Sequence, residues 1–193
     1  MDYEQILENL RKKIYHPVYF LCGEEPYYAD MISDYIEKNV LKPEERDFNQ
    51  SVFYGKDTDI AVVVETCRRY PMMASQQVVI VKEAQSWKDL KPLATYLKAP
   101  LRTTILVVNY KYAKPDLRTQ EGKEIRDKSV FLETKALRDY QIPDWIESYI
   151  RKKDYTIAPQ AKELLADYLG TDLGRVTNEL NKLFITVPPG NRI

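Results

Sequence analysis

Short segments of apolar and β-branched residues recur along the first part of the chain and predict five β-strands. They lie at residues 18–21, 48–54, 78–81, 104–108 and 129–132. Residues 78–81 (VVIV) and 105–108 (ILVV) are uninterrupted apolar runs. Such runs are typical of strands that are buried on both faces of a parallel sheet.

Helical patterns separate these strands. In each pattern, apolar residues at spacings of three and four share one side of a predicted helix. The patterns lie at residues 6–14, 31–40, 57–69 and 87–97, and Asp57 or Asp59 is the expected N-cap of the third helix. This alternation predicts an α/β fold, in which helices cover both sides of a parallel five-stranded sheet.

The strand pattern ends at Leu132, and only helical patterns follow. Pro143 and Pro159 suit the first turns of two helices, Gly170 ends the second, and Thr171 or Asp172 begins a third. We therefore predict an α/β domain at residues 1–139 and a small three-helix domain at residues 140–193.

Composition narrows the class of protein. Residues 1–60 contain 13 acidic and 7 basic side chains, a net charge of −6, whereas residues 61–193 contain 16 and 22, a net charge of +6. This asymmetry indicates separate faces for separate partners, but it is milder than in strongly basic nucleic-acid-binding domains.

The two cysteines lack metal-ligand spacing, which favours reduced thiols in a cytoplasmic protein. Since no apolar run approaches the roughly 20 residues of a membrane span, we expect no membrane association.

The segment after the first predicted strand has the position of a phosphate-binding loop. That motif needs a glycine, four residues, a second glycine, a lysine and a Ser or Thr. Gly23 begins the motif, but Tyr28 stands at the second glycine, Ala29 at the lysine and Asp30 at the hydroxyl residue. The loop has the location of a nucleotide site without the residues that bind phosphate.

Two further differences support this interpretation. Glu24 and Glu25 add carboxylates to the turn that would have to hold phosphate. Lys82 follows the strand at residues 78–81, where a nucleotide hydrolase needs an acidic ligand for Mg²⁺. We therefore expect no cofactor, no metal and no intrinsic ATPase activity. An ATPase with a degenerate phosphate loop is the catalytic alternative.

A second candidate site lies between the helix at 57–69 and the strand at 78–81. Its residues are Tyr70, Pro71, Met72 and Met73. Pro71 ends the helix and favours an extended Tyr70. Because loops lie at the surface and methionine is flexible and apolar, the pair suits a wedge that enters another protein's pocket. In the alternative interpretation, both methionines fold inward over the sheet edge.

Residues 111–128 form a basic stretch that acidic residues interrupt. Its cations are Lys111, Lys114, Arg118, Lys123, Arg126 and Lys128. Alternating charge is typical of a solvated helix, and a DNA-binding module is the alternative.

Four segments together resemble a known family. They are residues 15–27 (YHPVYFLCGEEPY), 70–84 (YPMMASQQVVIVKEA), 103–108 (TTILVV) and 170–183 (GTDLGRVTNELNKL). They resemble the delta subunit of the bacterial DNA polymerase III clamp loader, part of a DNA-directed DNA polymerase holoenzyme. The resemblance implies an AAA+-like fold without ATPase activity, and a subunit that binds and opens the ring-shaped sliding clamp, the beta subunit.

In that family a hydrophobic pair fills a pocket of the clamp. The pair corresponds to Met72 and Met73, next to Tyr70 and Pro71, so the resemblance favours the wedge. Two methionines depart from the aliphatic–aromatic pair typical of the family. Its members also carry a helical collar domain that joins the other clamp-loader subunits. The chain therefore resembles the first two domains of a longer subunit.

Overall fold

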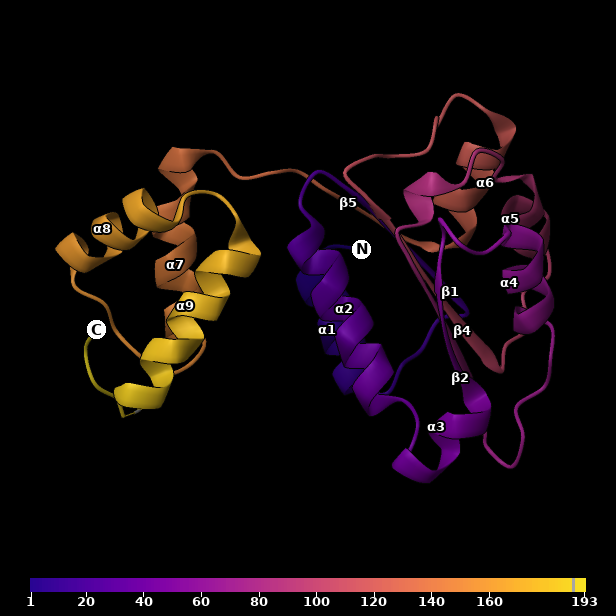
Figure 1. Cartoon of the computed structure of the whole chain (residues 1–193), viewed down its shortest axis with the longest axis horizontal. Coiled ribbons are helices and arrows are strands. Elements are labelled where there is room, and N and C mark those ends of the chain that lie inside the picture. The colour runs from indigo at the N-terminus through magenta and orange to yellow at the C-terminus, as the bar shows by residue number, and fades with distance from the viewer. Residues whose placement is uncertain (189) are drawn as a thin grey trace. The chain divides into compact units, whose positions relative to one another are not determined.

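The computed structural model describes residues 1–188 and 190–193. Its internal contacts divide the chain into two compact units, Met1–Lys135 and Ala136–Ile193 (Figure 1). The sequence placed this division a few residues later, between residues 139 and 140.

The first unit contains a five-stranded sheet with the order β2-β3-β4-β1-β5. The strands are β1 (Val18–Gly23), β2 (Gln50–Tyr54), β3 (Gln77–Lys82), β4 (Thr104–Lys111) and β5 (Val130–Thr134). Every neighbouring pair is parallel. The predicted parallel five-stranded sheet is confirmed.

Helices cover both faces of this sheet, as Figure 1 shows. They are α1 (Tyr3–Arg11), α2 (Pro26–Asn39), α3 (Pro43–Asn49), α4 (Ile60–Cys67), α5 (Lys91–Tyr96) and α6 (Gln120–Lys128), with a short 3₁₀ turn η1 at Ala84–Ser86. Helices α1 and α2 pack on one face, and α4, α5 and α6 pack on the other. Neighbouring residues of β3 point to opposite faces, so Val78 joins one core cluster and Val79 joins the other.

The structure corrects two predicted boundaries near the methionine pair. The strand expected at residues 48–54 begins at Gln50, because Pro43 starts a helix that continues through Asn49. The helix expected at residues 57–69 begins after Asp59, whose carboxylate accepts a hydrogen bond from the backbone N–H of Ala61. It ends at Cys67, two residues before the expected end, and the methionines lie in the connection that follows.

Three other helices also differ in extent from their patterns. The helix expected at residues 6–14 ends at Arg11, and the one expected at 31–40 already begins at Pro26. The helix expected at 87–97 is confined to Lys91–Tyr96. The indole N–H of Trp87 donates a 2.9 Å hydrogen bond to the carbonyl oxygen of Thr58, which holds the preceding segment outside the helix.

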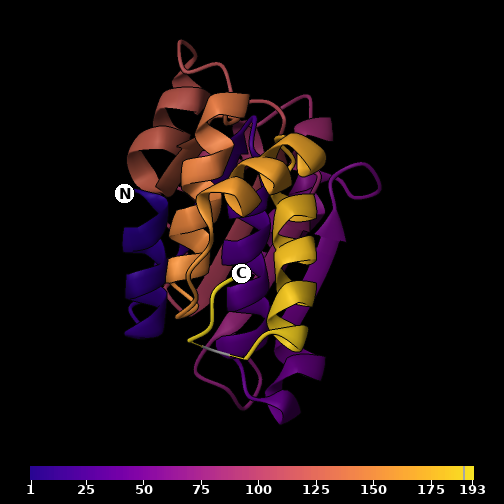
Figure 2. The same cartoon turned by 90° about the vertical axis from the view of Figure 1, so that its left-hand side faces the viewer.

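In the part of the second unit that the structure describes, three helices follow a 3₁₀ turn η2 at Asp139–Gln141. They are α7 (Ile142–Arg151), α8 (Pro159–Leu169) and α9 (Leu173–Thr186), seen close together in Figure 2. The ring of Phe184 stacks on Tyr149 of α7 and on Tyr155 after it. The Asp172 carboxylate caps α9 by accepting the backbone N–H of Arg175 at 3.0 Å.

Candidate functional site

We call residues 68–76, which connect α4 to β3, the methionine loop. Met72 is 62% exposed, Met73 102% and Tyr70 73%. These exposures are incompatible with the alternative in which both methionines fold inward over the sheet. Met73 also has a φ of 54°, a conformation that is uncommon outside glycine, so the chain turns sharply at this residue.

The buried side chain of Asn49 holds the backbone of this loop. Its Oδ1 atom accepts the N–H of Met72 at 2.6 Å, and its Nδ2 atom donates to the Met72 carbonyl oxygen at 2.9 Å. Nδ2 also donates to the carbonyl oxygen of Glu45 at 2.9 Å, within α3. Hydrogen bonds from Asn49 to both the N–H and the carbonyl oxygen of Met72 therefore fix the backbone from which the Met72 side chain projects. A loop ordered in advance loses less conformational freedom on binding.

Asn49 also brings a further apolar side chain to the same region. Phe48, the residue before it in α3, is 72% exposed. Phe48, Tyr70, Met72 and Met73 thus lie on two segments that hydrogen bonds join. Single exposed apolar residues are ordinary, whereas neighbouring ones such as Met72 and Met73 are typical of an interaction surface. The sequence interpretation missed Phe48 and Asn49, although Pro43 followed by two glutamates is a pattern for a helix start.

The phosphate-loop position serves the fold instead of a nucleotide. Gly23 has a φ of 117°, and a Cβ atom there would lie 2.0 Å from the carbonyl oxygen of Thr134. The close approach of β5 therefore requires this glycine. The backbone N–H of Gly23 donates to the Ala113 carbonyl oxygen, and that of Glu24 donates to Thr134, both at 2.9 Å. Two N–H groups that a phosphate loop would direct at a nucleotide are already bonded.

The start of α2 is occupied as well. Glu25 is buried, and its Oε1 atom accepts the backbone N–H of Tyr27 at 3.0 Å. This carboxylate lies at the positive end of the helix dipole, where a phosphate would otherwise bind. The ring of Tyr28 packs on Tyr3, with centroids 4.7 Å apart, and Ala29 is buried in the core.

Two ion pairs lie at this end of the sheet. Asp30 pairs with Lys111 of β4, with 2.6 Å between Oδ1 and Nζ. Lys82, at the position of a metal-binding acid, pairs with Glu37 of α2 at 3.6 Å. The described residues contain no group of three or more His, Cys, Asp or Glu side chains that could hold a metal ion.

The basic stretch at 111–128 is largely neutralised by neighbouring carboxylates. Four of its six cations have such partners: Lys111 with Asp30, Lys114 with Glu133, Arg118 with Asp116 and Arg126 with Asp127. Hydrogen bonds from Arg118 lower the pKa of Asp116 to about 2. Cations that are already paired bind DNA phosphates less strongly, so this geometry favours the solvated-surface interpretation.

Two other features bear on chemistry and location. Cys22 and Cys67 are buried, and burial raises the pKa of each thiol to about 12, so neither supplies a reactive thiolate near neutral pH. Within the described ranges, every helix is too short or too polar to span a membrane.

The family described as DNA polymerase III, delta subunit, matches residues 19–135. DNA polymerase III subunit delta of Bacillus subtilis (strain 168) is 27% identical over 188 aligned positions, and the match covers 92% of this chain and 54% of the relative. The structure of the Bacillus subtilis DNA clamp loader delta protein matches with a TM-score of 0.81 and 23% identity, covering 99% of this chain and 59% of that one.

The chain thus spans somewhat more than half the length of both relatives. The likeness to the solved structure concerns the fold. Together with the strand order, it confirms the expected AAA+-like α/β fold with further helices at the C-terminal end.

Proposed function

Because this chain belongs to the DNA polymerase III delta subunit family, we propose that it binds a ring-shaped sliding clamp and opens one interface of the ring. The observation that carries this proposal is the exposed pair Met72 and Met73 on a backbone that Asn49 fixes. In this proposal the pair enters an apolar pocket of the clamp, with Tyr70 and Pro71 at the pocket's edge.

The energy for opening comes from binding alone. Burying a methionine side chain contributes about 1.5–3 kcal/mol before ordering costs. Such a wedge favours the open ring only to the extent that it binds the open ring more tightly than the closed one. No bond is made or broken by the subunit in this mechanism.

ATP acts on other subunits in this proposal. The capped start of α2 and the bonded N–H groups of Gly23 and Glu24 favour a subunit without nucleotide over the degenerate ATPase. We also propose that the subunit works in the cytoplasm and joins the other clamp-loader subunits through the collar domain characteristic of the family. The partial neutralisation of residues 111–128 gives the DNA-binding alternative little support.

The test is the double variant Met72→Ala/Met73→Ala. Its affinity for the sliding clamp of the same organism should fall at least about 100-fold, since losing both side chains removes about 3–6 kcal/mol of apolar burial. Its melting temperature should not change, because both side chains are exposed in the free protein. Surface plasmon resonance and thermal unfolding measure the two quantities.

The matched control is Met31→Ala/Val62→Ala. These apolar side chains are 40% and 49% exposed but lie on α2 and α4, outside the methionine loop. The control should bind the clamp normally. Unchanged affinity of the Met72/Met73 variant, or an equal loss in the control, would contradict the wedge. A large drop in melting temperature would instead indicate that the pair supports the fold.

A further inference from the structure

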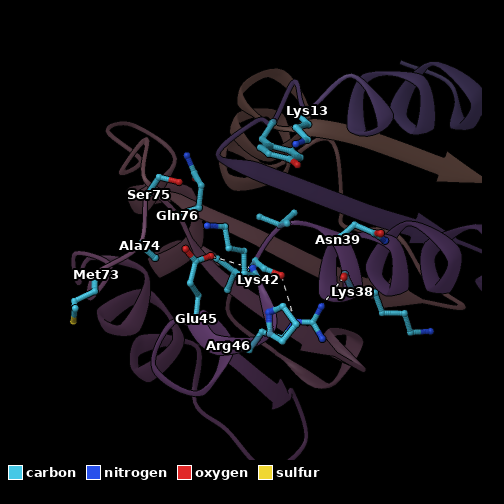
Figure 3. Close-up of a pocket in the computed structure, with 14 residues that line it drawn as sticks. Lys13, Lys38, Asn39, Lys42, Glu45, Arg46, Met73, Ala74, Ser75 and Gln76 are labelled. Atoms are coloured by element: carbon cyan, nitrogen blue, oxygen red, sulfur yellow. Dashed lines mark hydrogen bonds between the residues drawn. The ribbon is translucent and has the colours of Figure 1, made fainter.

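A groove of about 790 Å³ lies beside the methionine loop in the first unit. The loop after α1, the segment from the end of α2 into α3, and the end of the methionine loop line it. Figure 3 shows Lys13 on one side and Glu45 and Arg46 on the other, with Met73 at the edge. Its charged lining consists of four cations, Lys13, Lys38, Lys42 and Arg46, and one anion, Glu45.

Most of these cations have no carboxylate partner. Lys38 pairs with Asp34 at 3.3 Å along α2. Within the part of the chain that the structure describes, no carboxylate lies at ion-pair distance from Lys13, Lys42 or Arg46. Like charges gathered in a groove raise its positive potential, and an anionic group that binds there relieves their repulsion.

The contacts within the groove position its charges without neutralising them. The Arg46 guanidinium donates to the carbonyl oxygens of Lys38 at 2.7 Å and Leu41 at 3.4 Å. Glu45 accepts the backbone N–H of Lys42 at 3.0 Å, which leaves the Lys42 ammonium exposed. The groove therefore differs from the basic stretch at 111–128, where carboxylates cover most of the cations.

Met73 connects this groove to the proposed wedge. The same residue lines the groove and belongs to the exposed methionine pair. A protein that buries Met72 and Met73 must therefore also approach the mouth of the groove. Protein interfaces commonly surround an apolar centre with a polar rim, and complementary charges on that rim accelerate association.

We propose that this groove binds an acidic segment of the same partner protein, whose carboxylates face Lys13 and Lys42. This inference rests on the proposed function, because the clamp that receives the methionines is the partner. Continuity with the methionine pair favours a protein ligand over a nucleic acid.

The test uses the full chain with Lys13→Glu/Lys42→Glu and measures clamp binding at about 50 mM and about 500 mM salt. At low salt, association should slow and affinity should fall about tenfold or more, since two attractive contacts become repulsive. At high salt the difference from wild type should shrink, because ions screen exposed charges. The Met72→Ala/Met73→Ala variant should bind weakly at both concentrations.

The matched control is Lys123→Glu/Lys128→Glu. It makes the same change of net charge at exposed residues of α6. It should behave as wild type, and an equal loss in the control would overturn the inference by showing an effect of net charge alone. The milder variant Lys13→Gln/Lys42→Gln, with a wild-type melting temperature, guards against misfolding and should show a smaller loss in the same direction.

The remaining outcomes separate this inference from the proposed function. Wild-type affinity of the groove variant at low salt overturns the inference and leaves the wedge intact. Failure of the wild-type chain to bind the clamp overturns both. Weaker binding of the groove variant to a short DNA duplex, with normal clamp binding, overturns the inference in favour of a nucleic-acid ligand.

Discussion

Replacing Asn49 with alanine should disorder the methionine loop without changing any of its exposed apolar residues. The substitution removes the two hydrogen bonds to the backbone of Met72, at 2.6 and 2.9 Å. It also removes the bond to the Glu45 carbonyl oxygen at 2.9 Å. The variant therefore tests how the order of the loop affects clamp binding while the apolar residues of the loop stay the same.

The expected effect follows from these bonds. A hydrogen bond within a protein contributes about 0.5–1.5 kcal/mol net, so the two bonds to Met72 together contribute about 1–3 kcal/mol. If they hold the loop in its binding conformation, losing them lowers the population of that conformation about 5- to 150-fold. Affinity for the clamp should fall by a similar factor, although Met72 and Met73 are unchanged.

Amide hydrogen exchange tests the cause directly. The Met72 amide should exchange at least about fivefold faster in Asn49→Ala, because Oδ1 no longer accepts its proton. The amide of Ile80, in the buried strand β3, reports global unfolding and shows whether the change is confined to the loop. Asn49→Asp is the matched variant, since it keeps an acceptor for the Met72 N–H but cannot donate to the Met72 carbonyl. The oxygen that replaces Nδ2 would face the carbonyl oxygens of Met72 and Glu45 in this buried site, so Asn49→Asp should also loosen the loop.

Two results would refute this reasoning. Unchanged exchange of the Met72 amide would show that Asn49 does not hold the loop. Faster exchange with unchanged clamp affinity would show that loop order is not needed for binding.

Two further predictions concern the phosphate-loop position. Calorimetric titration with Mg-ATP at millimolar concentration should give no heat of binding. Glu25 caps α2, and the N–H groups of Gly23 and Glu24 already donate to backbone carbonyl oxygens. Saturable binding at micromolar concentration would contradict this prediction. Gly23→Ala should lower the free energy of unfolding by more than about 2 kcal/mol in urea denaturation, because its Cβ would meet the Thr134 backbone. Gly170→Ala, at a φ of 71° and a ψ of −153° with nothing within 4 Å, should carry backbone strain alone, about 1–3 kcal/mol, and a loss at Gly23 no larger than this would argue against the close approach of β5.

The sheet was predictable because its strands carry their signal locally. The uninterrupted apolar runs of β3 and β4 give strands that are buried on both faces, and their residues are almost fully inaccessible. Helix α3 was missed for the opposite reason. It has seven residues, and the only one it buries is the polar Asn49, so no apolar stripe marks it. Phe48 and the residues after it therefore looked like the start of β2.

Only those candidate-site residues that lie together in one segment could be predicted from the sequence. The methionine pair stands out because a proline-broken connection is expected at the surface, but Asn49 lies 23 residues away from Met72 in the sequence and meets it through folding alone.

The distribution of charge along the sequence does not predict which surface of the folded protein carries unpaired cations. The groove cations come from residues 1–60, which carry a net charge of −6, whereas the conspicuous basic stretch belongs to the positive remainder. Folding reverses this contrast, because carboxylates pair with four of the six cations of that stretch: Asp116 and Asp127 are close in sequence to their partners, whereas Lys111 meets Asp30, 81 residues away. In the groove, Glu45 bonds to a backbone N–H, and Lys13 and Lys42 have no carboxylate partner among the residues that the structure describes. An acidic partner should therefore bind at the groove cations beside the methionine loop, although residues 1–60 carry a net negative charge.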